Sequence, residues 1–356
     1  MKHFLTGLIL IISTSSWAMN WQSRYGVDLE VGTDDNFFLR QVSETDTNFS
    51  QLSLFAGADG NSETGYVNYL LRVNGHNYSD KTINDDATAS FLLGMGSQGE
   101  RFSSNLDLSY VNQTTYDSEL LDTGLRIDGR RESVIVAPGL SYRLTERHSL
   151  SGSLDFEDVS YNTNLLRDYQ DKALNLSWIY GLNEQSDLSA NLRYSQYEQE
   201  NLPATNTSSI FMGYVLRTSR NTTYNFTLGY TSVEGPLDTR TSTTYRVLID
   251  NDFDELNNFT FRLSQLYRPS GVGVVRLENR LGLGWVHAFT EKLQGLLSAD
   301  YLHVTTRDYY EIKPGIGYQF TQYLNLAGSY RYRRDDNVIL GIAESNSVLL
   351  TLSYNR

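Results

Sequence analysis

Residues 24–31 read Arg24-Tyr25-Gly26-Val27-Asp28-Leu29-Glu30-Val31. Apolar side chains stand at the odd positions, and polar or small residues stand at the even positions. Successive side chains of a β-strand point to opposite faces, so this stretch predicts a strand with one apolar and one polar face. An amphipathic helix would instead repeat its apolar residues every three or four positions.

The same alternation recurs along the rest of the chain. It is present in residues 105–110, 149–156, 187–194, 223–230, 259–263 and 324–333. No segment shows a convincing apolar run at helical spacing. The sequence therefore predicts an all-β protein.

Two kinds of connection separate the predicted strands. Short polar turns lie at 59–62, 98–101, 145–148, 183–186, 219–221, 251–254, 290–292 and 321–323, about 37 residues apart on average. Longer and generally more acidic connections alternate with them, at 33–46, 78–86, 117–129, 162–168, 201–206, 235–240, 306–310 and 334–344. The repeating unit is a hairpin, and its spacing predicts about 18 strands, with 16 as the alternative.

This organisation is typical of a transmembrane antiparallel β-barrel of the bacterial outer membrane, with short periplasmic turns and longer extracellular loops. Lipid outside the barrel and water inside it take the place of a core, and closure leaves no unpaired strand edge in hydrocarbon. The 25 tyrosines and 15 phenylalanines suit aromatic girdles at the two membrane interfaces. A soluble sandwich, solenoid or adhesin is the alternative, but we would expect linkers and more buried apolar runs in it.

Composition excludes several other classes of protein. The chain has no cysteine, which excludes a disulfide framework, a thiolate metal site and a cysteine nucleophile. The net charge of -13, without any basic block, argues against nucleic acid as a partner. Beyond residue 13 no apolar run approaches the ~20 residues of a membrane-spanning helix.

The first 18 residues have the layout of a secretory signal peptide. Met1-Lys2-His3 is positive, residues 4–12 are apolar, and Ser16-Trp17-Ala18 places small residues before a cleavage point. A short buried helix or an anchor is the alternative, although the apolar stretch is shorter than a membrane span. We expect residues 19–356 to form a single barrel domain in the outer membrane.

Strand parity also predicts the residues that line the lumen. If the apolar positions face lipid, the polar positions of the same strands face water inside the barrel. The predicted lumen residues are Arg24, Asp28, Glu30, Arg72, Asp107, Asp155, Glu157, Arg193, Arg246, Arg262, Arg276, Glu278, Arg280, Asp300, Arg331 and Arg333. Such a wall suits a water-filled conduit for a hydrophilic solute, because arginine presents a charged fork to carboxylates or hydroxyls. Alternatively, these charges pair across strands and only hydrate the wall.

Two acidic motifs occur at predicted neighbouring positions of the extracellular rim. They are Asp34-Asp35-Asn36 and Asp335-Asp336-Asn337, which closure of the barrel brings close together. Their oxygens could form a patch for a divalent cation or another ligand. We favour the alternative of turn chemistry, because Asp and Asn side chains hydrogen-bond nearby backbone, and we predict no bound metal and no cofactor.

The sequence does not predict an enzyme. Motifs for a serine hydrolase, a zinc protease or a nucleotide-binding loop are missing from it. A hydrolase acting at the rim would have to use His76 near Asp80, or His303 near Asp308. Isolated rim histidines are far more common than catalytic ones, so we predict no catalytic residues.

Several short motifs resemble the putative β-barrel porin 2 family. They are Asp34-Asp35-Asn36-Phe37-Phe38, the stretch from Tyr330 to Asn337, and the terminal Tyr354-Asn355-Arg356. Members of that family often accompany exopolysaccharide synthesis systems. The resemblance implies an outer-membrane conduit that works with a separate periplasmic polysaccharide-export protein.

Together with the predicted polar lumen, this resemblance implies export of exopolysaccharide for capsule, slime or biofilm matrix. The expected partners are outer-membrane lipid and lipopolysaccharide, the polysaccharide itself and the periplasmic export protein. A general or sugar-selective diffusion porin is the alternative. A structural surface protein and a rim-active hydrolase are weaker alternatives.

Overall fold

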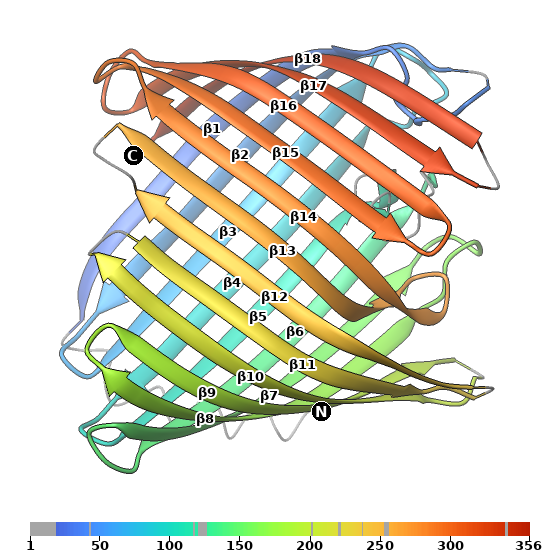
Figure 1. Cartoon of the computed structure of the whole chain (residues 1–356). Helices are drawn as coiled ribbons and strands as arrows, with labels where there is room; N and C mark the ends of the chain where they lie inside the picture. The colour runs from blue at the N-terminus through green and yellow to red at the C-terminus, as the bar shows by residue number, and fades with distance from the viewer. Residues whose placement is uncertain are drawn as a thin grey trace.

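The chain forms a closed barrel of 18 antiparallel β-strands (Figure 1). The computed structural model describes residues 19–42, 44–116, 118–119, 127–200, 202–219, 222–236, 238–252, 256–338 and 341–356. The predicted signal peptide, residues 1–18, lies outside them. The fold class and the strand number predicted from the sequence are confirmed.

The strands follow one another around the barrel in chain order. They are β1 Asn20–Asp34, β2 Thr47–Asn61, β3 Gly65–Tyr78, β4 Asp86–Gln98, β5 Phe102–Thr114, β6 Arg130–Arg143, β7 His148–Tyr161, β8 Tyr169–Asn183, β9 Ser186–Gln199, β10 Thr205–Ser219, β11 Thr222–Glu234, β12 Thr239–Asp252, β13 Asn257–Ser270, β14 Val274–Ala288, β15 Leu293–Val304, β16 Arg307–Gln319, β17 Leu324–Asn337 and β18 Gly341–Asn355. Each strand pairs with the next, and β18 pairs with β1 from Asn355↔Gly26 to Ser347↔Asp34. Closure gives every strand two neighbours, so no strand edge exposes unpaired backbone groups to the hydrocarbon of the membrane.

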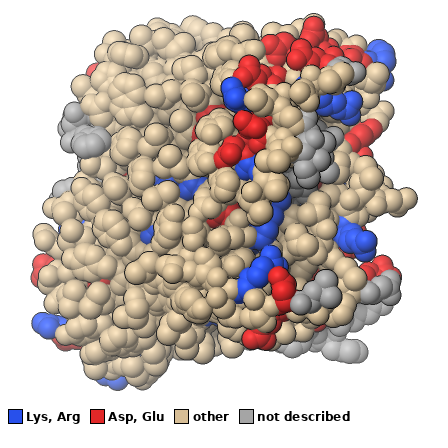
Figure 2. All heavy atoms as spheres, turned by 45° about the vertical axis from the view of Figure 1, so that its right-hand side comes forward, with Lys and Arg blue, Asp and Glu red and all other residues tan. Residues whose placement is uncertain are grey.

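The outer wall is apolar. Val27, Leu29 and Val31 of β1 face outward, as do Leu52 and Leu54 on the neighbouring β2. Figure 2 shows Lys, Arg, Asp and Glu concentrated toward the loop end of the barrel, while most of the wall beside it carries other residues. This apolar belt around a closed barrel places the protein in the bacterial outer membrane.

The two ends of the barrel differ in their connections. Both chain ends of the barrel, Asn20 and Asn355, lie at the end with the short periplasmic turns. At the extracellular end the connections are long between the early strands, as at 35–46 and 115–129. They shorten to 271–273, 305–306 and 338–340 between the late strands. Among the described residues, no helix is long and apolar enough to span a bilayer.

The sequence predicted longer connections at 306–310 and 334–344, and both predictions are wrong, because most of these residues belong to strands. Residues 307–310 belong to β16, and the turn before them has only two residues, Thr305 and Thr306. Residues 334–337 end β17, and residues 341–344 begin β18. Their charged side chains made these segments resemble loops, but they extend the hairpins beyond the membrane into water, where polar residues are favoured on both faces.

Candidate functional site

The sixteen predicted lumen residues share the inner face of the barrel. On each strand they alternate with lipid-facing side chains, as Asp28 does with Val27 and Leu29, and the register carries this face from strand to strand. Several of them form ion pairs across strands. Arg193 lies 3.1 Å from Asp155, and Arg72 lies 3.7 Å from Asp28. A role for these residues in solute passage stays a prediction.

The inner faces of β12, β13 and β14 form an arginine wall. It consists of Arg240, Arg246, Arg262, Arg268, Arg276 and Arg280. The buried carboxylate of Glu278 lies among them, within 3.5–3.6 Å of nitrogens from Arg268, Arg276 and Arg280. The six arginines outnumber the carboxylates beside them, those of Asp238, Asp250, Glu278 and Asp300, so the wall carries a net positive charge toward the lumen.

An apolar patch lies on the inner faces of β2 to β6. It consists of Phe55, Leu70, Leu92, Val111 and Ile135. Arg72 interrupts it, because this residue is in register with Phe55 and its guanidinium carbon lies 5.3 Å from the centre of that ring. Strands β4 and β13 are nine positions apart in a circle of 18. The apolar patch and the arginine wall therefore lie on opposite sides of the lumen.

A cavity of about 770 Å³ lies inside the barrel beside the arginine wall. Arg246 and Arg280 line one part of it, and Arg131, Glu157 and Asp171 line another. Its size and its mixture of charged and aromatic side chains suit a small organic solute.

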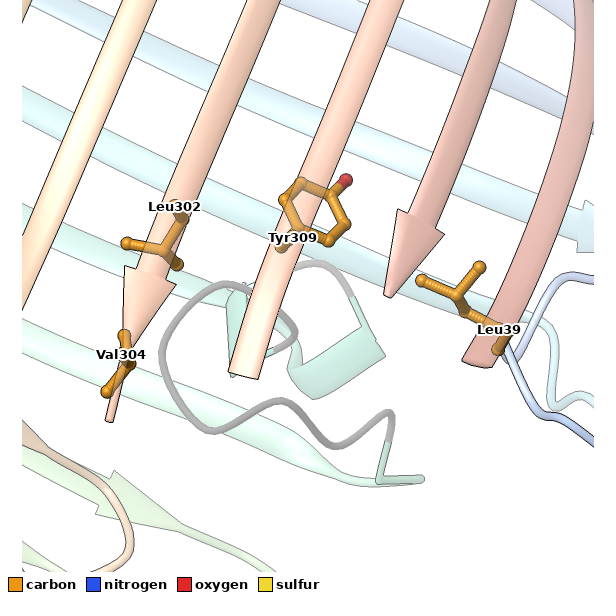
Figure 3. Close-up of a cluster of buried hydrophobic side chains, with 5 residues drawn as sticks. Leu39, Leu302, Val304 and Tyr309 are labelled. Atoms are coloured by element: carbon orange, nitrogen blue, oxygen red, sulfur yellow. The ribbon is translucent and has the colours of Figure 1, made fainter. Parts of the chain in front are cut away.

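Loop L1, which joins β1 to β2 (residues 35–42 and 44–46), folds into the extracellular mouth. Phe37 and Phe38 pack against Tyr78 and Tyr116, with ring centroids 5.2–5.7 Å apart. Leu39 lies on the other side of the loop and contacts an inner-face cluster formed by Leu302, Val304, Tyr309 and Ala343 (Figure 3). L1 thus reaches from the ends of β3 and β5 to β15 and β16, and narrows the mouth.

A second set of loop contacts lies over β6 to β9. The buried carboxylate of Glu119 accepts a hydrogen bond of 2.9 Å from the Tyr161 hydroxyl and lies 3.5 Å from Arg131. From the β13–β14 turn, the carbonyl of Ser270 accepts a 2.8 Å bond from the Tyr197 hydroxyl. Burial raises the pKa of the Tyr116 phenol above its ordinary value.

The two acidic rim motifs are joined, but not as an open acidic patch. Asp34 is fully buried, and Arg333 donates a 2.5 Å hydrogen bond to its carboxylate. Asp335 is also buried and accepts bonds of 2.8 and 3.0 Å from Arg307 Nε. Each of these two carboxylates is occupied by an arginine, so the patch that was considered as the less favoured reading of the sequence does not form from them.

The remaining rim residues bind backbone or neighbouring side chains. Asp35 accepts bonds from both nitrogens of Asn346, Asn36 binds Arg40 and Glu344, and Asp336 lies 3.7 Å from Arg334. Asn337 ends β17 in register with Gly341. Within the described residues, no three carboxylate or histidine side chains gather as a set of metal ligands.

The structure brings together His303 and Asp308, one of the histidine–aspartate pairs considered for hydrolysis. His303 Nδ1 lies 2.9 Å from Asp308, which also accepts a 2.6 Å bond from the Tyr301 hydroxyl. The other aspartate, Asp80, accepts bonds from the amide and the hydroxyl of Thr82. The amide bond, and then the hydroxyl bond, hold the pKa of the Asp80 carboxyl below its ordinary value.

Sequence reasoning missed several charged groups of the inner face. Arg131, Arg240, Arg268 and Arg307 follow the same parity as the predicted set, so strand alternation extended to the strand ends would have found them. The position of Glu119 could not be inferred in that way. It depends on how a loop returns into the barrel, which periodicity does not encode.

Comparison with known proteins identifies relatives in fold. No protein-family model matches the chain, so the resemblance to the putative β-barrel porin 2 family stays a prediction. No curated protein matches it in sequence either. Among solved structures, a BenF-like porin from Pseudomonas fluorescens Pf-5 superposes with a TM-score of 0.55 at 11% identity, covering 95% of this chain and 98% of the porin.

Two further structures are similar to the same extent. OccAB2 of Acinetobacter baumannii gives a TM-score of 0.53 at 10% identity, over 96% of this chain and 99% of the other. OpdK of Pseudomonas aeruginosa, in a crystal structure with vanillate, gives 0.50 at 14% identity, over 94% and 98%. The chain therefore has the fold of outer-membrane porins. At these identities the likeness concerns the fold alone.

Proposed function

We propose that the protein is a diffusion porin for small organic anions that carry an apolar or aromatic body. The observation behind the proposal is the arrangement of two unlike walls across one lumen. The arginine wall on β12 to β14 offers guanidinium groups to a carboxylate, and the apolar patch on β2 to β6 offers contact to the rest of the solute.

The similar fold of OpdK, whose crystal structure contains vanillate, supports this class of solute. Vanillate is an aromatic carboxylate, and so combines the two chemical features that the walls address. Contacts of this kind must be weak and repeated along the path, because a solute that binds too tightly does not leave.

Export of exopolysaccharide, which the sequence favoured, fits the mouth of the barrel less well. A polymer chain needs a continuous wide path through both ends. L1 and the contacts of Glu119 occupy the extracellular end with buried side chains. We therefore infer passage of small solutes, and expect a deletion strain to keep its surface polysaccharide.

Purified protein in planar bilayers tests the proposal. We expect a wild-type channel that prefers anions and whose ion current is reduced by benzoate but not by benzyl alcohol, which has the ring without the charge. Replacing Arg246 and Arg280 by glutamine should lower both the anion preference and the benzoate effect. Arg334→Gln is the matched control, because it removes one positive charge from the outer face.

Two outcomes would contradict the proposal. One is a cation-selective wild-type channel. The other is an equal effect of benzoate and benzyl alcohol on the current, which would mean that the carboxylate is not recognised. A loss of cell-surface polysaccharide on deletion, with normal uptake of aromatic acids, would instead favour the export function.

A further inference from the structure

The seam between β1 and β18 is incomplete at its extracellular end. Strand pairing stops at Asp34↔Ser347, but β18 begins six residues earlier in the chain, at Gly341. Residues 341–346 of β18 therefore extend past the end of β1. A strand edge without a partner exposes backbone donors and acceptors that need to be satisfied.

The first residues of L1 continue the pairing with β18 beyond the end of β1. The Asp35 amide donates to the Asn346 carbonyl at 3.1 Å, and the Asn346 amide donates to the Asp35 carboxylate at 2.6 Å. Two residues before Asn346 in β18, the Glu344 carbonyl accepts a hydrogen bond of 2.8 Å from Asn36 Nδ2. One backbone bond and two side chains thus take the place of the missing strand over this part of the edge.

Asn36 also folds the loop itself. The Arg40 amide donates to Asn36 Oδ1 at 3.0 Å, and Asn36 Nδ2 donates to the Arg40 carbonyl at 2.8 Å. These bonds close a turn around residues 37–39. Leu39, at φ 50, is thereby directed to its inner-face cluster, and Phe37 and Phe38 are directed to Tyr78 and Tyr116.

We propose that Asn36 is the positioning residue that joins closure of the barrel to narrowing of its mouth. It is 1% exposed, and its single side-chain amide binds both β18 and the turn of L1. Loss of this amide frees the turn from the seam, and Leu39 then leaves its cluster. The inference concerns the width of the mouth and does not depend on which solute passes.

A cysteine reporter beneath L1 tests this directly. The natural chain has no cysteine, so Ala343→Cys provides a single thiol, at a position that is 7% exposed and belongs to the same buried cluster as Leu39. In this background Asn36→Ala should raise the rate of labelling by a bulky maleimide by up to about tenfold, because one net hydrogen bond shifts an equilibrium by up to about that factor. Single-channel conductance in potassium chloride should rise as well.

Asn183→Ala is the matched control. The Asn183 side chain also holds a turn, where its Oδ1 accepts hydrogen bonds from Gln185 and Ser186, but this turn lies at the periplasmic end. This variant should label and conduct like the parent. Because conductance of a simple salt and thiol labelling involve no organic anion, this test can succeed or fail independently of the proposed solute.

Asn36→Ser serves as a milder variant, because serine keeps a hydroxyl but does not reach both carbonyls. It should change labelling in the same direction. Folding of Asn36→Ala is checked first, by the resistance of the barrel to unfolding in detergent without heating. If the folded variant labels and conducts like the parent, the proposal is overturned. Failure of both variants to assemble would also overturn it, since Asn36 would then be needed for folding of the seam.

Discussion

At the scale of single residues, the most consequential group is the buried carboxylate of Asp34. It accepts hydrogen bonds from Arg333, Ser345 and Ser347, and so joins the end of β1 to β17 and β18. A buried charge is tolerated in a protein only when it is paired and hydrogen-bonded, and both conditions hold here. The motif that suggested a rim patch is therefore part of the barrel wall.

Asp34→Ala should destabilise the barrel by about 3–5 kcal/mol, because it leaves Arg333 buried without this partner. Urea unfolding in detergent, followed by tryptophan fluorescence, measures the change. The double variant Asp34→Ala/Arg333→Met should recover much of the loss. A single variant as stable as the wild type would show that water reaches this pair.

A pH dependence follows from Asp80 in the β3–β4 connection. Its folded pKa is lowered by the bonds from Thr82, so its contribution to local order is present above the unfolded pKa and is lost as pH falls through the folded value. We expect acidification below about pH 4 to loosen the turn at Thr82. Amide exchange at Thr82, corrected for its intrinsic pH dependence, should show this in the wild type and not in Asp80→Ala.

At the scale of elements, the hairpin of β15 and β16 departs most from the sequence prediction. Its turn consists of Thr305 and Thr306, and Thr305 has a φ of 30. A β-branched residue at positive φ is strained, whereas Asn adopts this region readily. The turn residues usual in such tight hairpins are missing, and this is why the sequence pointed to a longer loop.

Thr305→Asn should therefore stabilise the protein by up to about 1 kcal/mol. Thr306→Asn in the same turn is the control and should change stability by less than about 0.5 kcal/mol. The midpoint of urea unfolding distinguishes the two. An unchanged or lower midpoint for Thr305→Asn would mean that its side chain makes contacts that outweigh the strain.

At the scale of the whole molecule, strand parity divides the barrel between lipid and water. Leu228, at the middle of β11, is 61% exposed on the outer wall, and Thr227 beside it faces the lumen. Leu228→Arg should cost about 2–4 kcal/mol, because it places a charge at the membrane midplane. Thr227→Arg should be tolerated, with lower conductance as its main effect. Equal costs in a folding assay with lipid vesicles would contradict this assignment of faces.

The sequence by itself determined the barrel. An exact period of two leaves no freedom in which face is apolar, so the inner face and the outer-membrane location could be inferred from it. The spacing of the turns gave the number of strands. The arginines of β12 to β14 were predicted only in part, as single lumen residues. Parity places these arginines on one inner face, where they form a wall. Only the order of the strands in the closed barrel shows that this wall lies opposite the apolar patch.

The tertiary structure alone decided how the mouth is built. Asp34 and Arg333 are 299 positions apart in the chain, and Asn36 and Glu344 are 308 apart. Leu39 and Leu302 are likewise distant, yet they share one cluster. Loop sequences have no repeating pattern, so their contacts cannot be predicted from periodicity. These contacts arise because closure brings β1 and β18 together, and the buried polar groups at that junction must then find partners.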